Sequence, residues 1–524
     1  NTVIRMGGGN DRVAITSSWT PLAYNAILNV GDGDNDVTLT GVWALYSSSG
    51  IIAGDGNNTI TLNGGAIGFN SNDYSFIRTG NGHNTITVTG NDTRYALSYG
   101  SVTTGSGNDT ITVKTTNKAA MSNYAFIDAG DGDNDITVSG SYGMEIGSSI
   151  TTGSGDDAIR VSGTAGYGMN NATITAGDGS DTIIVSSKNS YGISNSTIDA
   201  GNGDNEIHIS GSREGIYYSS KVISGDGNDV ITISGDMWGI RENASVNAGD
   251  GNNTITISGG TDHGIYWYSS VTAGSGDDVI TVSGGQRGMT DSASIDAGDG
   301  DNTVSVSGGA YGLYNSTIIT GEGSDHITII ASAGNTGMYG SKVESGAGSD
   351  HVFIHGNITG STVNTGDGND FLHLEGGLVN SASKLTGGGN DSLDFSEGRL
   401  GDVLSLGRDA ATSLAGSNAL GGIKAANTSG FETLHLDFEG ESDTIDIDAL
   451  IDALKNQNFK DDNAFESLVI SADENDTVLK GAGTWTAGET GMTLDGFDGY
   501  YDRYTVNNGL ETIEMYIQSN SSII

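Results

Sequence analysis

The chain has 524 residues, no cysteine and a formal net charge of −44 at pH 7, from 65 acidic and 21 basic side chains. This charge excludes nucleic acid as a partner, because phosphate recognition needs a basic surface. The lack of cysteine excludes disulfides, thiolate metal sites and cysteine nucleophiles. No apolar run approaches the roughly 20 residues that cross a bilayer. We therefore expect no membrane span, and cations as the natural counterpart of the charge.

One phrase recurs seventeen times between Gly7 and Phe395, at intervals of 20 to 26 residues. It consists of a small residue, Gly-x-Gly-x-Asp/Asn-x, and then Ile, Val or Leu, as in residues 104–111 and 129–136. A fixed period of this length that carries strand residues is typical of a solenoid. Residues 1–397 are therefore expected to form an all-β, parallel β-solenoid of about 17 coils of about 24 residues. We expect it to be right-handed, because parallel crossovers almost always are.

Each repeat predicts three short strands, as residues 215–239 illustrate. The segment after the glycine turn alternates, with Ile231 and Ile233 on one face and Thr232 on the other, which indicates a strand with one buried side. A second strand carries Gly-apolar pairs such as Gly239-Ile240, and a third returns to the turn through one apolar residue such as Val222. Because the chain enters a turn phrase almost at once, we expect an uncapped first coil with a preceding segment or a partner packed on it.

The turn phrase itself suggests a metal site. Two glycines permit positive φ and let successive carbonyl groups point into one hollow, and the oxygen of the closing Asp or Asn completes it. Hard oxygen ligands in a flexible cage suit Ca²⁺ better than Mg²⁺ or Zn²⁺. The closing residue is Asp in ten turns and Asn in seven, and most of the Asn turns have an Asp one or three residues earlier. The sequence therefore predicts several Ca²⁺ ions along one edge, about one for each gap between coils.

The predicted metal ligands are the closing residues and the carboxylates near them in the turns. They are Asp11, Asp32, Asn35, Asp55, Asn58, Asp109, Asp131, Asn134, Asp157, Asp178, Asp181, Asp204, Asn205, Asp226, Asp229, Asp250, Asn253, Asp278, Asp299, Asn302, Asp325, Asp350, Asp367, Asp370 and Asp391. The alternative is that Gly, Asn and Asp merely tolerate tight turns without an ion. Stacked acidic loops without counter-ions would, however, repel each other by about 1 kcal/mol per pair even in water.

The turns resemble the RTX nonapeptide, Gly-Gly-x-Gly-x-Asp-x-apolar-x, of calcium-binding secreted proteins. The resemblance covers about residues 7–395 and recurs in phase. Two features differ from that pattern: the first Gly is usually Ala, Thr or Ser, and there is one turn for each coil of about 24 residues instead of two for each short coil. For this reason we expect ions along a single edge instead of the two-sided β-roll.

After Phe395 the turn phrase stops, and residues 398–524 are expected to form a smaller, mixed but mainly β domain. The segment 449–456 predicts a helix, and strands are predicted at 431–436, 467–470, 475–479, 483–485, 501–506 and 510–517. In that order they resemble the C-terminal region of proteins exported by type I ABC transporters of Gram-negative bacteria. The resemblance implies an uncleaved C-terminal export signal that engages the type I secretion machinery. The alternative is a domain that only caps the solenoid.

Taken together, the two resemblances imply a secreted protein of the extracellular space or cell surface. Acidic repeats would stay unfolded in a cytosol poor in Ca²⁺ and fold outside the cell, where Ca²⁺ binds.

One irregular group interrupts the repeat in the middle of the chain. It combines aromatic residues with arginine and is a candidate binding face for a glycan, a cell-surface ligand or another protein. Its members are Tyr217, Tyr218, Trp238, Arg241, Tyr266, Trp267 and Tyr268. The alternative is that these side chains only pack on the outer surface of the strands.

The sequence contains no Gly-x-Ser-x-Gly elbow, phosphate-binding loop or His-Glu-x-x-His zinc motif, so we do not expect an enzyme. The expected function is that of a secreted, calcium-stabilised structural protein of the bacterial surface or extracellular matrix. We expect it to self-assemble as a fibre, surface layer or adhesive coat, through head-to-tail or lateral contacts. The alternatives are a secreted polysaccharide-active β-helix enzyme and a glycan-binding adhesin module.

Overall fold

The computed structural model describes residues 2–67, 74–91, 95–375, 383–396, 427–437, 444–446, 467–471, 477–479, 484–492, 501–507, 512–518 and 522–523. The chain divides into two compact units, residues 1–275 and 276–524. The described residues of both units form strands and contain no helix. Each unit is a parallel β-solenoid, which confirms the predicted fold class.

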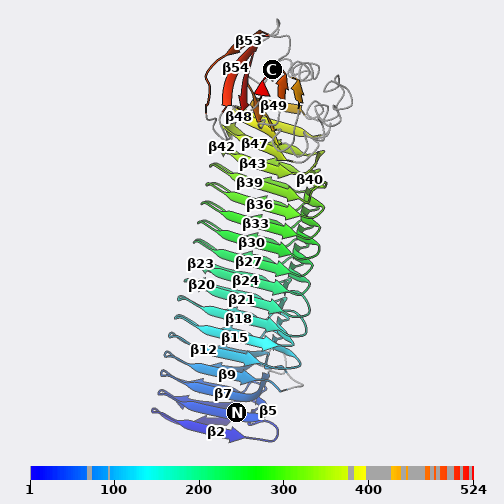
Figure 1. The fold of residues 1–524 in the computed structure, drawn as a ribbon. Helices are drawn as coiled ribbons and strands as arrows, with labels where there is room; N and C mark the ends of the chain where they lie inside the picture. Colours follow the sequence, from blue (N-terminus) through cyan, green and yellow to red (C-terminus); the bar gives the residue numbers. More distant parts are fainter. Residues whose placement is uncertain are drawn as a thin grey trace. The chain divides into compact units, whose positions relative to one another are not determined.

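In the first unit every coil passes through up to three columns of parallel strands. The strands that follow the glycine turns make the first column (Figure 1), in which β5, β7, β9 and β12 stack in order. This column contains β2 (Arg12–Thr16), β5 (Asp36–Tyr46), β7 (Thr59–Ile67), β9 (Thr85–Thr89), β12 (Thr110–Lys114), β15 (Asp135–Gly140), β18 (Ala158–Gly163), β21 (Thr182–Ser187), β24 (Glu206–Gly211), β27 (Val230–Gly235) and β30 (Thr254–Gly259).

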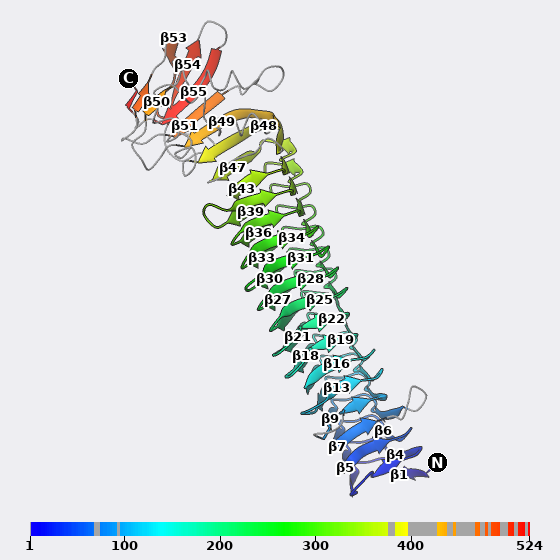
Figure 2. The same ribbon diagram turned by 90° about the vertical axis from the view of Figure 1, so that its right-hand side faces the viewer.

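The second column consists of short strands that start near the Gly-apolar pairs, and Figure 2 shows it from β13 to β28. It contains β3 (Leu22–Ala23), the ends of β5 and β7, β10 (Leu97–Ser98), β13 (Ala119–Ser122), β16 (Tyr142–Glu145), β19 (Met169–Asn170), β22 (Ile193–Ser194), β25 (Glu214–Tyr217), β28 (Trp238–Arg241) and β31 (His263–Tyr266).

The third column leads back to the glycine turns. It contains β1 (Thr2–Arg5), β4 (Ala26–Gly31), β6 (Gly50–Ala53), β8 (Ser75–Arg78), β11 (Gly100–Thr103), β14 (Phe126–Asp128), β17 (Ser149–Thr151), β20 (Thr173–Asp178), β23 (Thr197–Asn202), β26 (Lys221–Ile223), β29 (Ser245–Asn247) and β32 (Ser270–Thr272).

The second unit repeats the same three columns. The first column contains β33 (Val279–Gly284), β36 (Thr303–Gly308), β39 (His326–Ala331), β43 (His351–His355) and β47 (Phe371–Glu375). The second contains β34 (Arg287–Thr290), β37 (Tyr311–Tyr314), β40 (Thr336–Tyr339) and β44 (Ile358–Thr359), and the third contains β35 (Ser294–Asp296), β38 (Thr317–Ile319), β41 (Lys342–Glu344) and β45 (Thr362–Asn364). Two glycine turns also pair as β42 (Ala347–Gly348) and β46 (Asp367–Gly368).

The parallel pairing continues past residue 397. Strand β48 (Lys384–Ser396) pairs with β47 and with β49 (Asn427–Asp437), followed by β51 (Ser467–Ser471) and β55 (Thr512–Gln518). Strands β54 (Tyr501–Asn507) and β53 (Thr484–Ala487) add a small antiparallel sheet, and β50 (Thr444–Asp446), β52 (Thr477–Leu479) and β56 (Ser522–Ile523) pair in parallel. Each of the six segments predicted as strands contains a described strand. The helix predicted at 449–456 lies outside the described residues.

Register keeps identical positions above one another, which is what builds the core. In β12 and β15, for example, Ile111 pairs with Ile136 and Val113 with Val138, and all four side chains are fully buried. Buried and exposed side chains therefore alternate along each strand with the period of two that the sequence shows. Each apolar row is buried only by the rows of neighbouring coils, as expected for a solenoid.

The glycine turns need glycine for two reasons. Gly227 has φ of 142°, and a Cβ atom there would lie 2.1 Å from the carbonyl oxygen of Gly203 in the preceding coil. No side chain fits so close to a stacked backbone. Among the described residues, no helix has the length and apolar character of a membrane span.

Candidate metal centre

The closing residues of the glycine turns form a buried polar ladder. From Asn35 to Asn253 in the first unit, each of these side chains is at most 2% exposed. The backbone N–H of one closing residue donates to Oδ1 of the closing residue in the next coil. The N···O distances are 3.0 Å from Asp109 to Asn134 and 2.7 Å from Asn134 to Asp157. The ladder repeats in the second unit, with 2.9 Å from Asn302 to Asp325 and from Asp325 to Asp350.

Where Asn closes the turn, the side-chain amide is surrounded by carbonyl oxygens. Asn205 Nδ2 donates to the carbonyl oxygens of Gly201 at 3.2 Å, Gly203 at 2.9 Å and Ser224 of the next coil at 3.0 Å. Asn134 Nδ2 likewise donates to Gly130 at 3.2 Å and Gly132 at 2.7 Å. The amide hydrogens thus satisfy carbonyl groups that the glycine turn directs inward. An Asn-closed turn is complete without an ion.

Where Asp closes the turn, an oxygen stands in place of that amide nitrogen. After the first turn, its Oδ1 accepts the same ladder hydrogen bond, and in seven described turns its Oδ2 is buried without a hydrogen-bond partner. These are the turns of Asp11, Asp109, Asp157, Asp181, Asp229, Asp325 and Asp350. Ionised carboxylates and carbonyl groups can only accept hydrogen bonds. An Asp-closed turn therefore needs a proton or a cation to offset the buried charge.

Burial makes the ionised form of these carboxylates unfavourable. It raises the pKa of Asp109, Asp157, Asp229 and Asp350. It raises the pKa of Asp325 to about 6 and, together with the charges of Asp157, Asp156 and Asp178, that of Asp181 to about 7. Asp181 and Asp325 therefore change their protonation state close to neutral pH, where a cation can compete with the proton.

A hydroxyl group accompanies most of the Asp-closed turns. Five positions before many closing Asp residues stands Thr or Ser. The pairs are Thr104 and Asp109, Thr152 and Asp157, Ser224 and Asp229, Thr320 and Asp325, and Ser345 and Asp350. The same position is Ala before Asn58, Asn134, Asn205, Asn253 and Asn302. Each of these hydroxyl groups lies beside the carboxylate and opposes the rise of its pKa. Each also contacts a carbonyl oxygen of the next coil, at 2.6 Å from Thr104 to Ala129 and 2.9 Å from Ser224 to Ala248.

A hydroxyl has one hydrogen, so it cannot donate to the carbonyl and to the carboxylate together. Asp181 has Ala176 five residues earlier and lacks this hydroxyl altogether. The hydroxyl oxygens were not among the predicted ligands. Thr or Ser stands five residues before seven of the ten closing Asp residues but before only one closing Asn, Asn84, and this bias is the sequence signal that could have identified them.

The other predicted ligands form a second, exposed ladder on the outside of the turns. Asp55 N–H donates to Asp32 Oδ1 at 3.1 Å, Asn228 N–H to Asp204 Oδ1 at 2.7 Å and Glu322 N–H to Asp299 Oδ1 at 2.9 Å. Both the backbone N–H and the hydroxyl of Ser154 bond to Asp131 Oδ1 and lower the pKa of that carboxylate. Asp250 has a lowered pKa for the same reason, through the Ser275 hydroxyl and N–H.

The structure therefore separates the predicted ligands into two sets. Asp178, Asp226 and Asp367 belong with the exposed outer carboxylates, and Asp278 and Asp370 with the buried closing residues. Asp391 lies in β48, and its side chain lies outside the described part of the chain. Within the described residues, no three His, Asp or Glu side chains gather as a metal-binding group. Any cation in an Asp-closed turn would be held mainly by carbonyl oxygens with one carboxylate, an all-oxygen ligand set that suits Ca²⁺.

The members of the candidate binding face lie on consecutive coils. Tyr217 of β25, Arg241 of β28 and Tyr266 of β31 occupy one row, because they are register partners. The Arg241 guanidinium lies 4.6 Å from the Trp238 ring centre, 5.5 Å from that of Tyr217 and 5.7 Å from that of Tyr266. The structure thus brings the predicted aromatic and arginine residues together.

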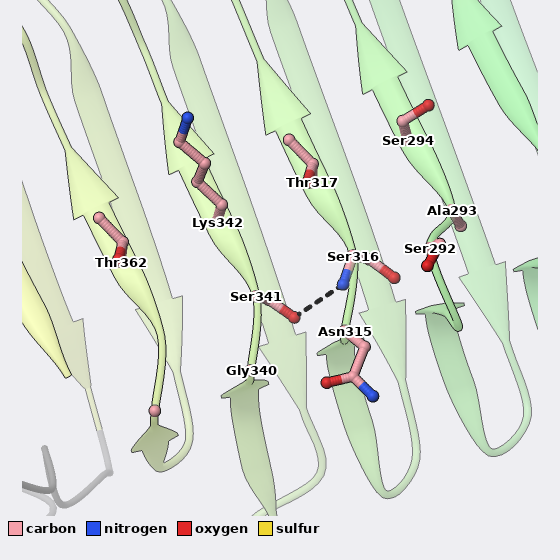
Figure 3. Close-up of a pocket in the computed structure, with 11 residues that line it drawn as sticks. Ser292, Ala293, Ser294, Asn315, Ser316, Thr317, Gly340, Ser341, Lys342 and Thr362 are labelled. Carbon is pink, nitrogen blue, oxygen red and sulfur yellow. Dashed lines mark hydrogen bonds between the residues drawn. The ribbon is translucent and has the colours of Figure 1, made fainter. Parts of the chain in front are cut away.

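A groove of about 360 Å³ runs across the bends between the second and third columns of the second unit. Figure 3 shows its small polar lining, which includes Ser292, Asn315, Thr317 and Thr362, and the hydrogen bond from Ser316 N–H to Ser341 Oγ at 3.1 Å. Its charged residue, Lys342, pairs with Glu344. The lining contains no pair of acids that could catalyse glycoside hydrolysis.

Comparison with known proteins yields no relative: no family model, no curated protein and no solved structure matches the chain.

Proposed function

We propose that the chain is a calcium-stabilised structural scaffold that works outside the cell. The observation that carries the proposal is the buried Oδ2 atom in the seven Asp-closed turns named above, which takes the place that an amide nitrogen occupies in an Asn-closed turn. A chain built only as a passive solenoid would be served by Asn throughout. Repeated use of Asp at a buried position favours a fold that depends on a cation.

The residues of one turn illustrate the site. In the coil of Asp229, the candidate ligands are its carboxylate, the carbonyl groups of Gly225 and Gly227, and the Ser224 hydroxyl. Bound Ca²⁺ would supply positive charge against the buried carboxylate. The chain positions these oxygens through the ladder hydrogen bond from Asn205 N–H to Asp229 Oδ1 at 2.8 Å and through the two glycine residues. Folding and ion binding are then coupled, because the oxygens come together only in the stacked coil.

The location outside the cell rests on the resemblance to RTX repeats and to type I secreted proteins. Cytosolic Ca²⁺ is scarce, so a chain with several sites of this kind would stay unfolded before export and fold afterwards. We also propose that the folded chains assemble as a fibre, surface layer or coat, since in-register coils offer the same groups at one regular spacing.

The test is a calcium titration of the metal-free chain at neutral pH, followed by far-UV circular dichroism and by a count of bound ions. We expect the β signal to develop as Ca²⁺ is added, and the same concentration of Mg²⁺ to restore much less of it. Light scattering and electron microscopy of the calcium-loaded chain then test assembly. A chain that keeps its β spectrum and melting temperature in chelator refutes the proposal.

A further inference from the structure

The bend between the second and third strand columns carries an exposed aromatic group in the first unit. One or two residues have positive φ at this bend in each coil of the first unit whose bend the structure describes. In three consecutive coils the bend consists of Tyr218 and Ser219, then Glu242 and Asn243, then Trp267 and Tyr268. These residues directly follow the row of Tyr217, Arg241 and Tyr266, so the three bends stack along the solenoid.

The aromatic residues at this bend strain the backbone. Tyr218, Trp267 and Tyr268 have φ of 45°, 50° and 54°. The left-handed conformation is unfavourable for residues other than glycine. Some coils of the first unit place Asn or Ser there, such as Asn171 and Asn195, and others place a single Tyr, such as Tyr99 and Tyr124, but the bend of Trp267 and Tyr268 carries two aromatic residues.

Burial of the rings does not offset this strain. The three side chains remain 52%, 44% and 61% exposed. Strained residues that contribute little to packing are candidates for a functional role.

The charged side chains beneath the bend are paired. The Arg241 guanidinium lies among the rings of Tyr217, Trp238 and Tyr266, and it bonds to Glu214 at 3.1 Å and Glu242 at 2.8 Å. Glu214 is 1% exposed, so this ion pair is anchored in the body of the coil. Arg213 lies 3.8 Å from Glu214 as well, so the two positive and two negative charges of this cluster balance and leave no excess charge that would select an ionic ligand.

We propose that Tyr218, Trp267 and Tyr268 bind a neutral, β-linked polysaccharide that lies along the solenoid. Parallel strands are about 4.8 Å apart, which places Tyr218 and Trp267 about 9.6 Å apart along the stack. In an extended β-1,4-linked chain, every second sugar turns the same apolar face toward one side. The hydroxyl groups of the intervening sugar lie between two such faces. The rings stack on those faces, and Glu242 and Asn243 between them accept and donate hydrogen bonds to the hydroxyl groups.

Two observations favour this ligand over other occupants. Glu242 lies between the exposed rings, whereas the centre of a protein–protein interface is depleted of charged residues. The net charge of −44 repels an anionic polysaccharide. The inference does not depend on the calcium sites, which lie at the glycine turns.

The experiment uses the full chain, folded in millimolar Ca²⁺. Binding is measured by co-sedimentation with microcrystalline cellulose and by quenching of tryptophan fluorescence with cellohexaose. The test variant combines Trp267→Asn and Tyr268→Asn, and we expect it to bind at least tenfold more weakly. Its melting temperature should stay equal or rise, because Asn tolerates positive φ. A purely structural role of the rings predicts a lower melting temperature instead.

The matched control is Tyr124→Asn, at a bend where the ring is 55% exposed and φ is 57° but Asn171 stands two coils further on. This control should bind as the wild type does. The proposal is wrong if the folded wild type binds neither probe, if the double variant binds equally well, or if the anionic polysaccharide alginate binds more tightly. Dimers of the wild type in sedimentation velocity that the double variant abolishes would assign the patch to a second copy of the chain.

Discussion

The Asn-closed and Asp-closed turns share one backbone and differ by one atom. In both, Oδ1 accepts the N–H of the preceding coil, as in Asp181 to Asn205 at 2.9 Å and Asn205 to Asp229 at 2.8 Å. The second terminal atom of the side chain differs: in Asn205 it is Nδ2, a hydrogen-bond donor, and in Asp229 it is Oδ2, a buried oxygen without a partner. The comparison shows that backbone geometry alone does not explain the Asp residues. Each Asp-closed turn gives up stability unless a proton or a cation is present.

Removal of calcium should have the largest effect, since it acts on every Asp-closed turn at once. One site saturated at a hundred times its Kd adds about 2.7 kcal/mol to the free energy of unfolding, and the buried Oδ2 atoms occur in seven described turns. At pH 7.5 we expect chelator to lower the melting temperature strongly or to unfold the chain, as measured by circular dichroism. Excess Ca²⁺, but not added NaCl, should reverse the change.

Introduction of a carboxylate into an Asn-closed turn should have the next largest effect. Asn205→Asp replaces the donor that bonds to Gly201, Gly203 and Ser224. In chelator the variant should lose about 1–3 kcal/mol, the usual result of leaving buried polar groups unsatisfied, and Ca²⁺ should restore part of this loss. Chemical denaturation in chelator and in Ca²⁺ measures both values. Equal destabilisation in both conditions would show that the new carboxylate binds no ion.

The reverse change should stabilise the metal-free chain. Asp229→Asn supplies the missing donor, so we expect a gain of about 1 kcal/mol in chelator and the loss of one bound ion in Ca²⁺. The control is Asp204→Asn, which removes the same charge from an exposed residue whose Oδ1 already accepts Asn228 N–H at 2.7 Å. If both variants behave alike, the general charge of the chain matters and the buried position does not.

Sequence patterns predicted the columns and their inward faces, because these depend on local alternation. Ile111 and Val113 are examples, and each of the six segments expected as strands after residue 397 contains a described strand. The pattern did not predict the two ladders of the turn. Whether Asp229 or Asp204 points inward depends on the backbone N–H groups of the neighbouring coil, which no single repeat contains. The sequence pattern also did not predict the left-handed conformation of Trp267, because tertiary contacts there override the local preference of the residue.

Protonation offers a second way to test the same turns. Folding raises the pKa of Asp325 to about 6 and of Asp181 to about 7, so the folded state holds these protons more tightly than the unfolded state, where the pKa is about 3.9. In chelator, stability should be highest below pH 4 for these groups and should fall as the pH rises through 6 to 7. Melting curves between pH 5 and pH 8 measure this fall. In saturating Ca²⁺ the fall should disappear, because the ion replaces the proton.

Removal of a single hydroxyl group near a closing residue should have the smallest effect. The comparison is between a hydroxyl group that precedes a closing Asp and one that precedes a closing Asn. Ser224→Ala removes the hydroxyl beside Asp229, which lowers the pKa of that carboxylate and contacts Ala248. We expect a loss of about 1 kcal/mol and weaker Ca²⁺ binding, both measurable by denaturation with and without the ion. Thr79→Ala is the matched control, because the Thr79 hydroxyl precedes Asn84 and is buried without a hydrogen-bond partner. Its removal should leave stability unchanged or slightly increase it. Equal losses in the two variants would mean that the hydroxyl groups serve packing alone and take no part in the response to calcium.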